Sequence, residues 1–508
     1  MRLRALSTGS RCRHAVGPAR FHRRFVAAVL VGSVAAAAAA TAASGAVRTY
    51  STRGTIPLRT SLFDPFTFAG SDRATAFAMA RAAGVSYVRI VARWRSIAPA
   101  SPYAGFAASD PTAPGYSWSY LDNTVASAEA VGLTPILDIG GPPGWALVSR
   151  PKGQDGGTPK IADLRAFATA IATHYDGNHG APRVKVWQIW NEPNLSLDLS
   201  PVSASKYRKM VNAFAGAVHE VDPANLVVAG DLDPFANKTK RFHTTAPLAF
   251  MRSLLCVSMG NPKAKKAKLR RPHASCKQRI QFDVWSHHPY TFNGPFGHAR
   301  RPDDVSLGDL PKMRALLKEG IKLHHVVSRH SVQFWVTEFS WDTNPPRKHA
   351  APVALEARWT AEALYQMWRS GVSLVTWFGF MDQPKPSVYQ SGLFFHAKKL
   401  ERARAKPMRT SFRFPFVAYL GTGNVTVWGR DATSTKTLVT VQRRHGNRGR
   451  WRTVARIRTN RYGIFKAKVR LAATKKDWLR ATARGSGKSL AFSLTPPSPK
   501  LRYGPWGN

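Results

Sequence analysis

Acidic residues are scarce in this chain of 508 residues, which has 28 Asp and Glu against 75 Lys and Arg, a formal net charge of +47. A charge so far from zero bears on association rather than on fold. It reflects either a lineage bias toward Arg or adhesion to an anionic cell-wall polymer or acidic polysaccharide. No fold known to bind nucleic acid is recognisable in the pattern, so nucleic acid is not an expected partner.

Long apolar runs are nearly absent, and the one that approaches membrane length lies at the N-terminus. It follows the basic residues Arg23 and Arg24, extends from 25 to about 40, and is followed by small residues that offer cleavage after Ala42 or Ala46. The run is mostly Ala, whereas a membrane span needs about 20 firmly apolar residues. We therefore expect residues 1–46 to be a signal peptide and the protein to be secreted, with an uncleaved anchor as the alternative.

Cysteine is also scarce, with Cys12, Cys256 and Cys276 as the three in the chain. Cys12 would leave with the signal peptide, and export would place the other two in an oxidising compartment. A disulfide between them would close a loop of about twenty residues and stabilise the fold by roughly 3 kcal/mol. The alternative is a pair of free thiols.

A glycine-rich phosphate loop is missing after the first predicted strand, which disfavours a doubly wound open sheet. One phrase does recur: a helix-forming run ends at glycine and a β-branched run follows. It reads "ARAAGVSYVRI" at 80–90, "AEAVGLTPILDI" at 128–139 and "MWRSGVSLVTWF" at 367–378. Glycine readily takes the left-handed conformation just beyond a helix. The phrase is therefore the joint of an αβ repeat, and repeated αβ units form a parallel sheet.

Eight strands alternate with helices between residues 55 and 395, which predicts a (β/α)8 TIM barrel. The strands are expected near 59–63, 86–91, 134–139, 184–190, 225–230, 281–286, 333–338 and 373–378. The helices are expected at 71–83, 118–131, 161–175, 202–220, about 247–257, 308–326 and 352–370, with Ser71 and Asp72 capping the first. The basic insertion 258–280 is expected on the surface.

The sequence pattern changes beyond about residue 412, where short segments of alternating apolar and polar residues, typical of strands, are bounded by turns. About seven such strands predict a small β-sandwich domain over 414–497. Residues 401–508 hold 25 Lys and Arg against 3 Asp and Glu. The basic stretch 396–413 is expected to be an irregular linker between the two domains.

Carboxylates stand at the ends of two predicted barrel strands, where the chemistry of such barrels takes place. The apolar run "VKVWQIW" leads into Asn191 and Glu192, and Pro193 then prevents the strand from continuing. Three strands later, "SVQFWVTEFSW" ends at Glu338. Two glutamates at the same end of a barrel are the pair of carboxyl groups that glycosidic bond cleavage requires. The alternative is a pair of acids that cap helices or form salt bridges.

These residues resemble the clan A (β/α)8 retaining glycoside hydrolases, and families 5 and 39 are the most similar branches. The motifs are "WNEPN" at the end of the fourth strand and "TEFSW" at the end of the seventh. The resemblance implies that Glu192 is the acid/base and Glu338 the nucleophile. It also implies substrate-site roles for Asn191, Arg89, His288, Tyr290 and Trp377. The third strand, "LDIGGPPGW", lacks the His of many family 5 enzymes, and Ser340 stands where Gly is common.

Several aromatic and polar residues remain open to two interpretations. Trp341 is predicted to bind substrate, but it, Trp145 and Trp190 are equally compatible with the core. Adjacent strand residues point to opposite faces, so His287 is expected to be packed while His288 lines the site, and the two cannot easily share a metal. No metal or cofactor is expected. Asp382 is a weaker candidate for the rim.

The sequence thus predicts a secreted, monomeric retaining glycoside hydrolase that acts on a β-linked polysaccharide or oligosaccharide by double displacement. Retention requires the two carboxyl groups to lie ~5–5.5 Å apart. One alternative is a non-catalytic protein that binds carbohydrate or cell wall on a glycosidase fold. Another is that the sandwich is the adhesive part and the barrel its partner.

Overall fold

The structure is a computed structural model that describes residues 47–498 and 502–506, apart from 55, 150–156, 240–241, 262, 264, 385–388, 434–435 and 447. The predicted signal peptide, 1–46, lies outside the described residues. Among the described residues, no helix has the length and apolar character that crossing a membrane requires.

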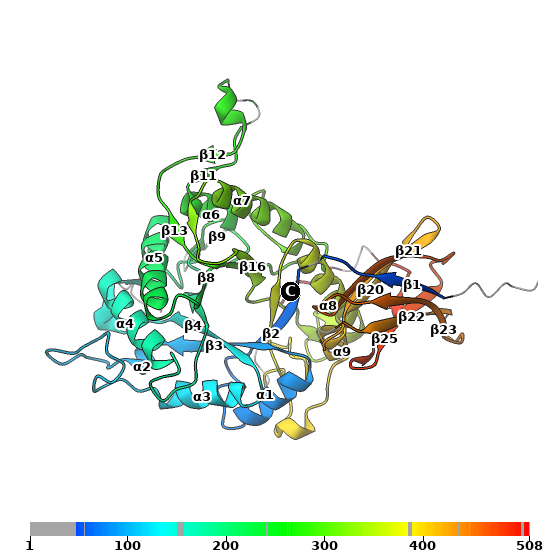
Figure 1. The fold of residues 1–508 in the computed structure, drawn as a ribbon, viewed down its shortest axis with the longest axis horizontal. Helices are drawn as coiled ribbons and strands as arrows, with labels where there is room; N and C mark the ends of the chain where they lie inside the picture. Colours follow the sequence, from blue (N-terminus) through cyan, green and yellow to red (C-terminus); the bar gives the residue numbers. More distant parts are fainter. Residues whose placement is uncertain are drawn as a thin grey trace, which may run out of the picture. The chain divides into compact units, whose positions relative to one another are not determined.

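A closed barrel of parallel strands confirms the predicted fold class (Figure 1). Every pair of neighbours is parallel, and β19 pairs with β2 to close the ring. The eight strands lie within a few residues of the predicted ranges. They are β2 Arg59–Phe63, β3 Tyr87–Arg93, β4 Thr134–Gly140, β7 Val186–Ile189, β8 Leu226–Leu232, β14 Val284–His287, β16 Gln333–Val336 and β19 Leu374–Phe378.

Helices surround the strands, and each of the seven predicted helices is present. They are α1 Arg73–Ala82, α3 Ser119–Glu129, α4 Ile161–His174, α5 Ala204–Val221, α6 Pro247–Leu255, α7 Leu310–Lys322 and α8 Val353–Arg369. Asp72 occupies the N-cap position of α1, but its side chain makes no capping hydrogen bond, so that predicted role is wrong. Ser203 does cap α5, because its hydroxyl accepts from the Lys206 backbone N–H at 3.3 Å.

Short elements decorate the loops of the barrel. They are α2 Trp94–Ile97, η1 Gly144–Ala146, β5 Leu147–Ser149, β6 Thr158–Pro159, β9 Asn237–Lys238, β10 His243–Thr244, β11 Val257–Ser258, η2 Ala267–Arg270, β12 His273–Ala274, β13 Ile280–Gln281, η3 Leu307–Asp309, β15 Val326–Val327, β17 Thr343–Asn344 and β18 Ala351–Pro352. The predicted surface insertion contains β11 and β12, which extend away from the barrel (Figure 1). Cys256 and Cys276 form the predicted disulfide at its base, with their Cα atoms 5.0 Å apart.

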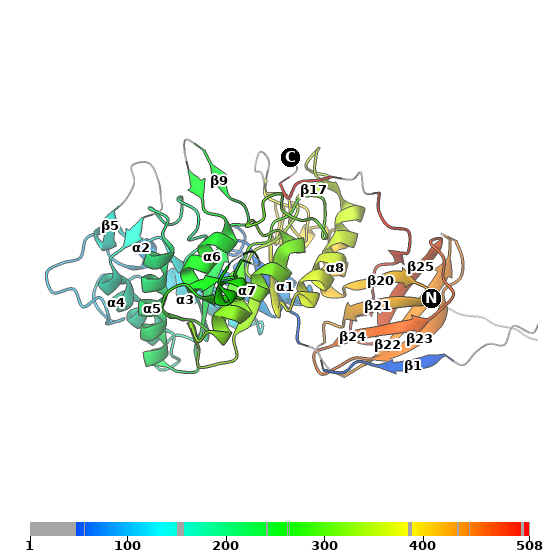
Figure 2. The ribbon, with the colours of Figure 1, turned by 90° about the horizontal axis from the view of Figure 1, so that it is seen from above.

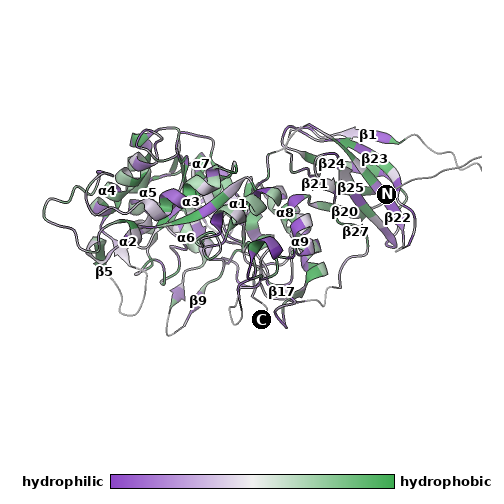
Figure 3. Cartoon of the chain, turned by 90° about the horizontal axis from the view of Figure 1, so that it is seen from below, coloured by the Kyte–Doolittle hydropathy of each residue, from purple (hydrophilic) through white to green (hydrophobic). Residues whose placement is uncertain are grey.

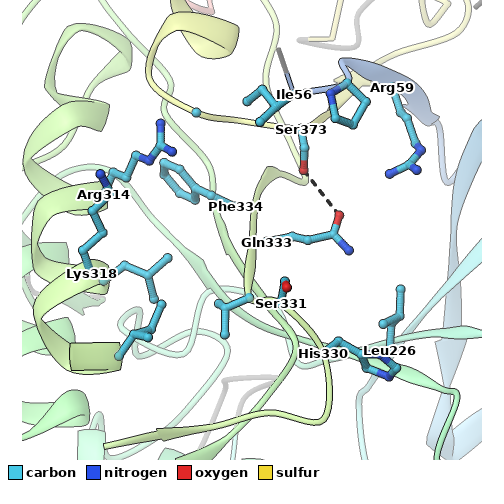
Figure 4. A pocket seen from close by; sticks show the side chains of 15 residues that line it. Ile56, Arg59, Leu226, Arg314, Lys318, His330, Ser331, Gln333, Phe334 and Ser373 are labelled. Atoms are coloured by element: carbon cyan, nitrogen blue, oxygen red, sulfur yellow. Dashed lines mark hydrogen bonds between the residues drawn. The ribbon is translucent and has the colours of Figure 1, made fainter. Parts of the chain in front are cut away.

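A cavity at the amino ends of the barrel strands is shown in Figure 4. It has a volume of about 470 Å³ and is lined by residues at or before strand starts, among them Arg59, Leu226, Gln333 and Ser373. The Ser373 hydroxyl donates to Gln333 Oε1 at 3.4 Å. Barrel enzymes carry their chemistry at the opposite, carboxyl ends of the strands. This cavity is therefore not the candidate site.

Beyond the barrel, two sheets share one buried core, as expected of a β-sandwich (Figure 2). Their strand pairs are antiparallel except that β1, which precedes the barrel in the sequence, pairs in parallel with β23. One sheet has the order β1-β23-β22-β25-β26, with β27 also on β25, and the other has the order β20-β21-β24. Hydrophobic and hydrophilic residues alternate along these strands (Figure 3). Their bounds are β1 Arg48–Ser51, β20 Phe416–Gly421, β21 Asn424–Arg430, β22 Leu438–His445, β23 Arg452–Arg458, β24 Ile464–Arg470, β25 Asp477–Ala483, β26 Gly487–Lys488 and β27 Phe492–Ser493.

The stretch 396–413 is not an irregular linker, so that prediction is wrong. It contains η4 Leu400–Arg402 and α9 Pro407–Arg413, and α9 packs on α8. Lys406 is fully buried, and its ammonium lies 2.6 Å from Asp382 Oδ1. A buried charge needs such a partner, so the apparent basic linker is a packed segment. The pair also removes Asp382 from the candidates for the rim of the site.

Candidate active site

The strand β7 ends one residue before Trp190, and the turn that follows aims Glu192. Trp190 has φ 67° and Glu192 has φ 38°, both in the left-handed region that side chains rarely adopt. The Glu192 backbone N–H donates to the Asp231 carbonyl at 3.1 Å, which fixes the turn against the next strand. We predicted that Pro193 ends the strand, but the change of direction precedes it. Backbone strain of this kind concentrates at functional sites.

Glu338 follows β16, and both of its oxygens are held. Arg89 Nη1 lies 2.9 Å from Oε2, and the Tyr290 hydroxyl donates to Oε1 at 2.8 Å. Burial and then the charge of Glu338 raise the pKa of Tyr290 well above its usual range, so the phenol keeps its proton and remains a donor. The carboxylate is therefore oriented by one charged and one neutral donor.

Arg89 is the hub that joins Glu338 to the turn after β7. Its Nη2 donates to Asp138 Oδ2 at 2.8 Å and to Asn191 Oδ1 at 2.9 Å, while Nη1 binds Glu338. Its guanidinium also lies 4.4 Å from the ring centroid of Phe63. One fully buried guanidinium thus fixes the positions of the predicted nucleophile and of Asn191, the neighbour of Glu192. The prediction gave Arg89 a substrate contact, but its partners make it a positioning residue.

Replacing Arg89 by Met should destabilise the fold by about 3–5 kcal/mol, because it leaves Asp138 buried without its cation. The free energy of unfolding from urea titration measures the loss. Arg89→Lys keeps the positive charge but not the paired N–H donors of the guanidinium, and it should lower the free energy of unfolding by less. Arg456→Met, at an exposed position on β23, is the matched control and should change little. Equal stability of Arg89→Met and the wild type would contradict the assigned role.

His288 holds Glu192 in the same way that Arg89 holds Glu338. Its Nδ1 lies 2.9 Å from Glu192 Oε1, and its Nε2 lies 3.6 Å from Asp231 Oδ1. Burial alone would lower the pKa of His288, but Glu338, Asp231 and Glu192 together raise it to about 10. Because the charge of each glutamate acts on this one ring, the two carboxylates share one electrostatic environment. The imidazolium is a buried donor that positions Glu192.

This shift predicts a specific dependence of stability on pH. The unfolded chain releases the His288 proton above its ordinary pKa of 6.5, whereas the folded protein keeps it until about pH 10. The stabilisation from His288 is therefore complete below pH 6.5 and falls as the pH rises toward 10. Urea unfolding of the wild type and His288→Gln at pH 6 and pH 9 should give a larger difference at pH 6. An equal difference in the free energy of unfolding at both pH values would contradict a protonated His288 in the folded protein.

His287 points to the other face of β14 and is packed, as predicted. Its Nε2 lies 2.8 Å from the Val305 carbonyl, and burial lowers its pKa to about 3. The two adjacent histidines therefore differ in charge. In the described part of the chain, no cluster of three His, Cys, Asp or Glu side chains is arranged to hold a metal ion.

Two half-buried acids around Glu192 were not predicted. Burial first, and then the charge of Glu192, raise the pKa of Asp198 and of Asp233 well above the usual range. The Asn191 amide lies 3.4 Å from Asp198 Oδ1. Asp198 comes from the loop after the motif, where no strand end marks it. Asp138 and Asp231 were also missed, although an acid within a buried strand such as "LVVAGDL" is a signal that could have found them.

A cavity of about 350 Å³ opens beside Glu338 at the carboxyl ends of the strands. Arg89, Asn191, Trp190 and Glu338 are among its lining residues, together with Asp138 and Asp198. Trp190 is nearly buried, and its indole N–H donates to the Asp198 carbonyl at 2.9 Å. Asn191 is thus the residue of the predicted set that offers an amide to a ligand there. A polar, partly enclosed cavity of this size suits a sugar unit.

Two of the predicted substrate contacts, Trp341 and Trp377, are instead core residues. Their exposures are 0% and 1%, and their indoles donate to backbone carbonyls, those of Thr291 at 3.0 Å and Ser391 at 2.8 Å. A ring with no exposed face cannot stack on a sugar, so the direct contacts predicted for them are wrong. Tyr290 and His288 are also buried, and they reach a substrate through the glutamates.

The family comparison agrees with this geometry. The family model described as "Cellulase (glycosyl hydrolase family 5)" matches residues 47–322, more than half of the chain. The chain belongs to glycosyl hydrolase family 5. The matched range of this family 5 member includes Arg89, Asn191, Glu192, His288 and Tyr290. This family is one of glycosyl hydrolases.

Individual relatives are more distant. A β-xylosidase from Geobacillus stearothermophilus is 30% identical over 124 residues, and the match spans 23% of this family 5 chain and about a quarter (24%) of the relative. Two solved structures are similar at lower identity. The GH39 enzyme from Xanthomonas axonopodis pv. citri has 16% identity and a TM-score of 0.49, covering 85% of this chain and 96% of that one. A GH39 β-xylosidase from Caulobacter crescentus has 18% identity and a TM-score of 0.47, covering 78% and 86%.

Proposed function

We propose that this family 5 enzyme is a retaining glycosidase that cleaves β-linked oligosaccharides by double displacement, with Glu338 as the nucleophile and Glu192 as the acid/base. The observation that carries the proposal is the separate support of the two carboxylates. Arg89 and Tyr290 hold Glu338, whereas His288 holds Glu192. Arg89 also binds Asn191, the residue that precedes Glu192 in the chain.

In the first step Glu338 Oε attacks the anomeric carbon, and the bond to the leaving-group oxygen breaks as Glu192 gives that oxygen its proton. The product is a glycosyl ester of Glu338 and a free alcohol. In the second step Glu192 takes a proton from water, whose oxygen attacks the same carbon and releases Glu338. Asn191, which lines the cavity beside Glu338, is placed to donate to a sugar hydroxyl. Arg89, His288 and Tyr290 keep the two carboxylates in place throughout.

A β-xyloside is the first substrate to test, because the bacterial relative with 30% identity is a β-xylosidase. The chain spans about a quarter of that relative, so the sugar is part of the proposal. The expected signal peptide supports secretion. The basic region 401–508, with 25 Lys and Arg against 3 Asp and Glu, favours an anionic cell-wall polymer as an additional partner.

The stereochemical outcome tests the mechanism. The purified full chain is mixed with a panel of nitrophenyl β-glycosides of xylose, glucose, mannose and galactose. Proton NMR then follows the first anomer released, before it mutarotates. We expect the β-anomer first. Initial release of the α-anomer would contradict double displacement, and absence of hydrolysis with measurable glycan binding would favour a non-catalytic role.

A further inference from the structure

Residues 502–506 return from the sandwich to the catalytic end of the barrel. The Asp342 backbone N–H donates to the Pro505 carbonyl at 2.8 Å, and the Asn293 backbone N–H donates to the Tyr503 carbonyl at 3.2 Å. Asp342 follows β16 and Asn293 follows β14, the strands that lead to Glu338 and His288. Figure 2 shows the C-terminus beside β17, at this end of the barrel. Two backbone hydrogen bonds therefore dock this segment on the loops of the active site.

The segment places an indole next to the residue that holds the predicted nucleophile. The ring of Trp506 lies 5.2 Å from the ring of Tyr290, with an angle of 42° between the planes. The Tyr290 hydroxyl donates to Glu338 Oε1 at 2.8 Å. Trp506 is half-buried, unlike Trp341 and Trp377. It is therefore a partly exposed indole in contact with Tyr290, whereas the two expected tryptophans are fully buried.

The same segment closes a second cavity, of about 500 Å³. Aromatic rings and guanidinium groups dominate its lining, which includes Phe235, Phe292, Tyr503, Arg300, Arg301 and Arg502. The rings of Phe235 and Phe292 lie 5.7 Å apart. Phe235 follows β8, whose Asp231 carbonyl accepts the Glu192 backbone N–H. This cavity therefore adjoins the loop after β8, the strand that holds the Glu192 turn, whereas the 350 Å³ cavity is lined by Glu338; Glu192 itself lines neither cavity.

The chemistry of a retaining enzyme gives the two cavities different occupants. Glu192 protonates the oxygen of the leaving group, so the leaving group must lie on its side of the bond being cleaved. The sugar that becomes attached to Glu338 occupies the cavity beside Glu338. The cavity completed by residues 502–504 then receives the part of the substrate that departs.

The charge of this cavity selects an acidic ligand. Arg300 and Arg502 are exposed residues that line the cavity, and Arg301 donates to the Ala236 carbonyl. The one carboxyl that lines the cavity is Asp304, whose Oδ1 accepts the Ala236 backbone N–H at 2.8 Å. Burial raises the pKa of Asp304, and the nearby Arg301 opposes that shift. Guanidinium groups bind carboxylates through paired hydrogen bonds.

We propose that residues 502–506 form a wall of the substrate site, and that the cavity they complete binds a leaving-group sugar carrying a carboxylate. Trp506 and Tyr503 supply aromatic faces, and Arg502 with Arg300 supplies the cationic contact. This inference rests on the proposed function for the order of the two cavities. The binding itself requires no turnover and is measured separately.

Calorimetric titration of the full chain carrying Glu192→Gln tests the inference, because this variant hydrolyses slowly and keeps the shape of the site. The two ligands are a neutral xylo-oligosaccharide and one of equal length that carries a uronic acid at its reducing-end side. We expect the acidic ligand to bind about tenfold tighter, the effect of one hydrogen bond to a charged group. Arg502→Ala should remove that preference, and Arg502→Lys should keep part of it.

Trp506→Ala should weaken both ligands by about tenfold, because a sugar loses its stacking surface. Arg456→Ala and Trp451→Ala, both in the sandwich, are the matched controls and should leave both affinities unchanged. Melting temperatures of all variants verify folding. Equal affinity for the two ligands, or unchanged binding in Trp506→Ala, would overturn the inference even if the wild type hydrolyses β-glycosides. A preference for the acidic ligand in a protein without hydrolysis would instead overturn the proposed function and leave this site standing.

Discussion

Glu338→Ala is expected to lower kcat/KM on a nitrophenyl β-glycoside by on the order of 10⁴-fold, the scale seen when a member of a catalytic unit is removed. The loss follows from the first step, because Glu338 is the carboxylate that Arg89 and Tyr290 hold together at the cavity. Initial rates over a range of substrate concentrations measure it.

Azide sharpens this test, because the shortened side chain leaves room for a small anion. Azide would attack the anomeric carbon from the face that Glu338 had occupied, so the product should be the α-glycosyl azide, identified by NMR. Glu401→Ala is the matched control, since Glu401 is exposed in η4, and it should retain full activity. Ordinary turnover by Glu338→Ala without azide would exclude Glu338 as the nucleophile.

The barrel was predictable because its signals are local. In the joints "RAAGV", "EAVGL" and "WRSGV", Gly84, Gly132 and Gly371 each have positive φ, where glycine is the residue without a steric penalty. Each joint fixes the end of a helix and the start of the next strand. The order of the strands then follows from the rule that αβ units form parallel, right-handed connections. The glutamates were found because strand ends of a parallel barrel converge.

The features that escaped prediction depend on segments that meet only in three dimensions. The sequence around Lys406 is typical of a basic linker, but Lys406 is buried and forms an ion pair with Asp382. Trp341 and Trp377 lie near strand ends in the sequence, where exposed aromatics are expected. In the structure their indole N–H groups donate to the carbonyls of Thr291 and Ser391 in the core. Trp506 lies beyond the sandwich in sequence, and no periodicity links it to Tyr290. Loops that return to a site leave no pattern in the sequence.

Glu192→Ala is expected to slow the enzyme by an amount that depends on the leaving group. For a substrate with a basic leaving group, kcat/KM should fall about 10²–10⁴-fold, the usual contribution of general acid catalysis. A dinitrophenyl glycoside departs without a proton, so its first step should be nearly unaffected. The second step still lacks its base, and a burst of dinitrophenol should precede slow turnover. Stopped-flow absorbance measures both phases.

Azide separates the two glutamates in this variant as well. It enters the space left by Glu192, on the opposite face from Glu338, and should convert the glycosyl ester to the β-glycosyl azide. Asp198→Asn is the informative comparison, because Asp198 is a half-buried carboxyl whose pKa is raised by burial and then by the charge of Glu192. If Asp198 rather than Glu192 delivered the proton, Asp198→Asn would show the dependence on the leaving group and Glu192→Ala would not. We expect the reverse, because His288 holds Glu192 just after β7, whereas Asp198 accepts a hydrogen bond from the Asn191 amide.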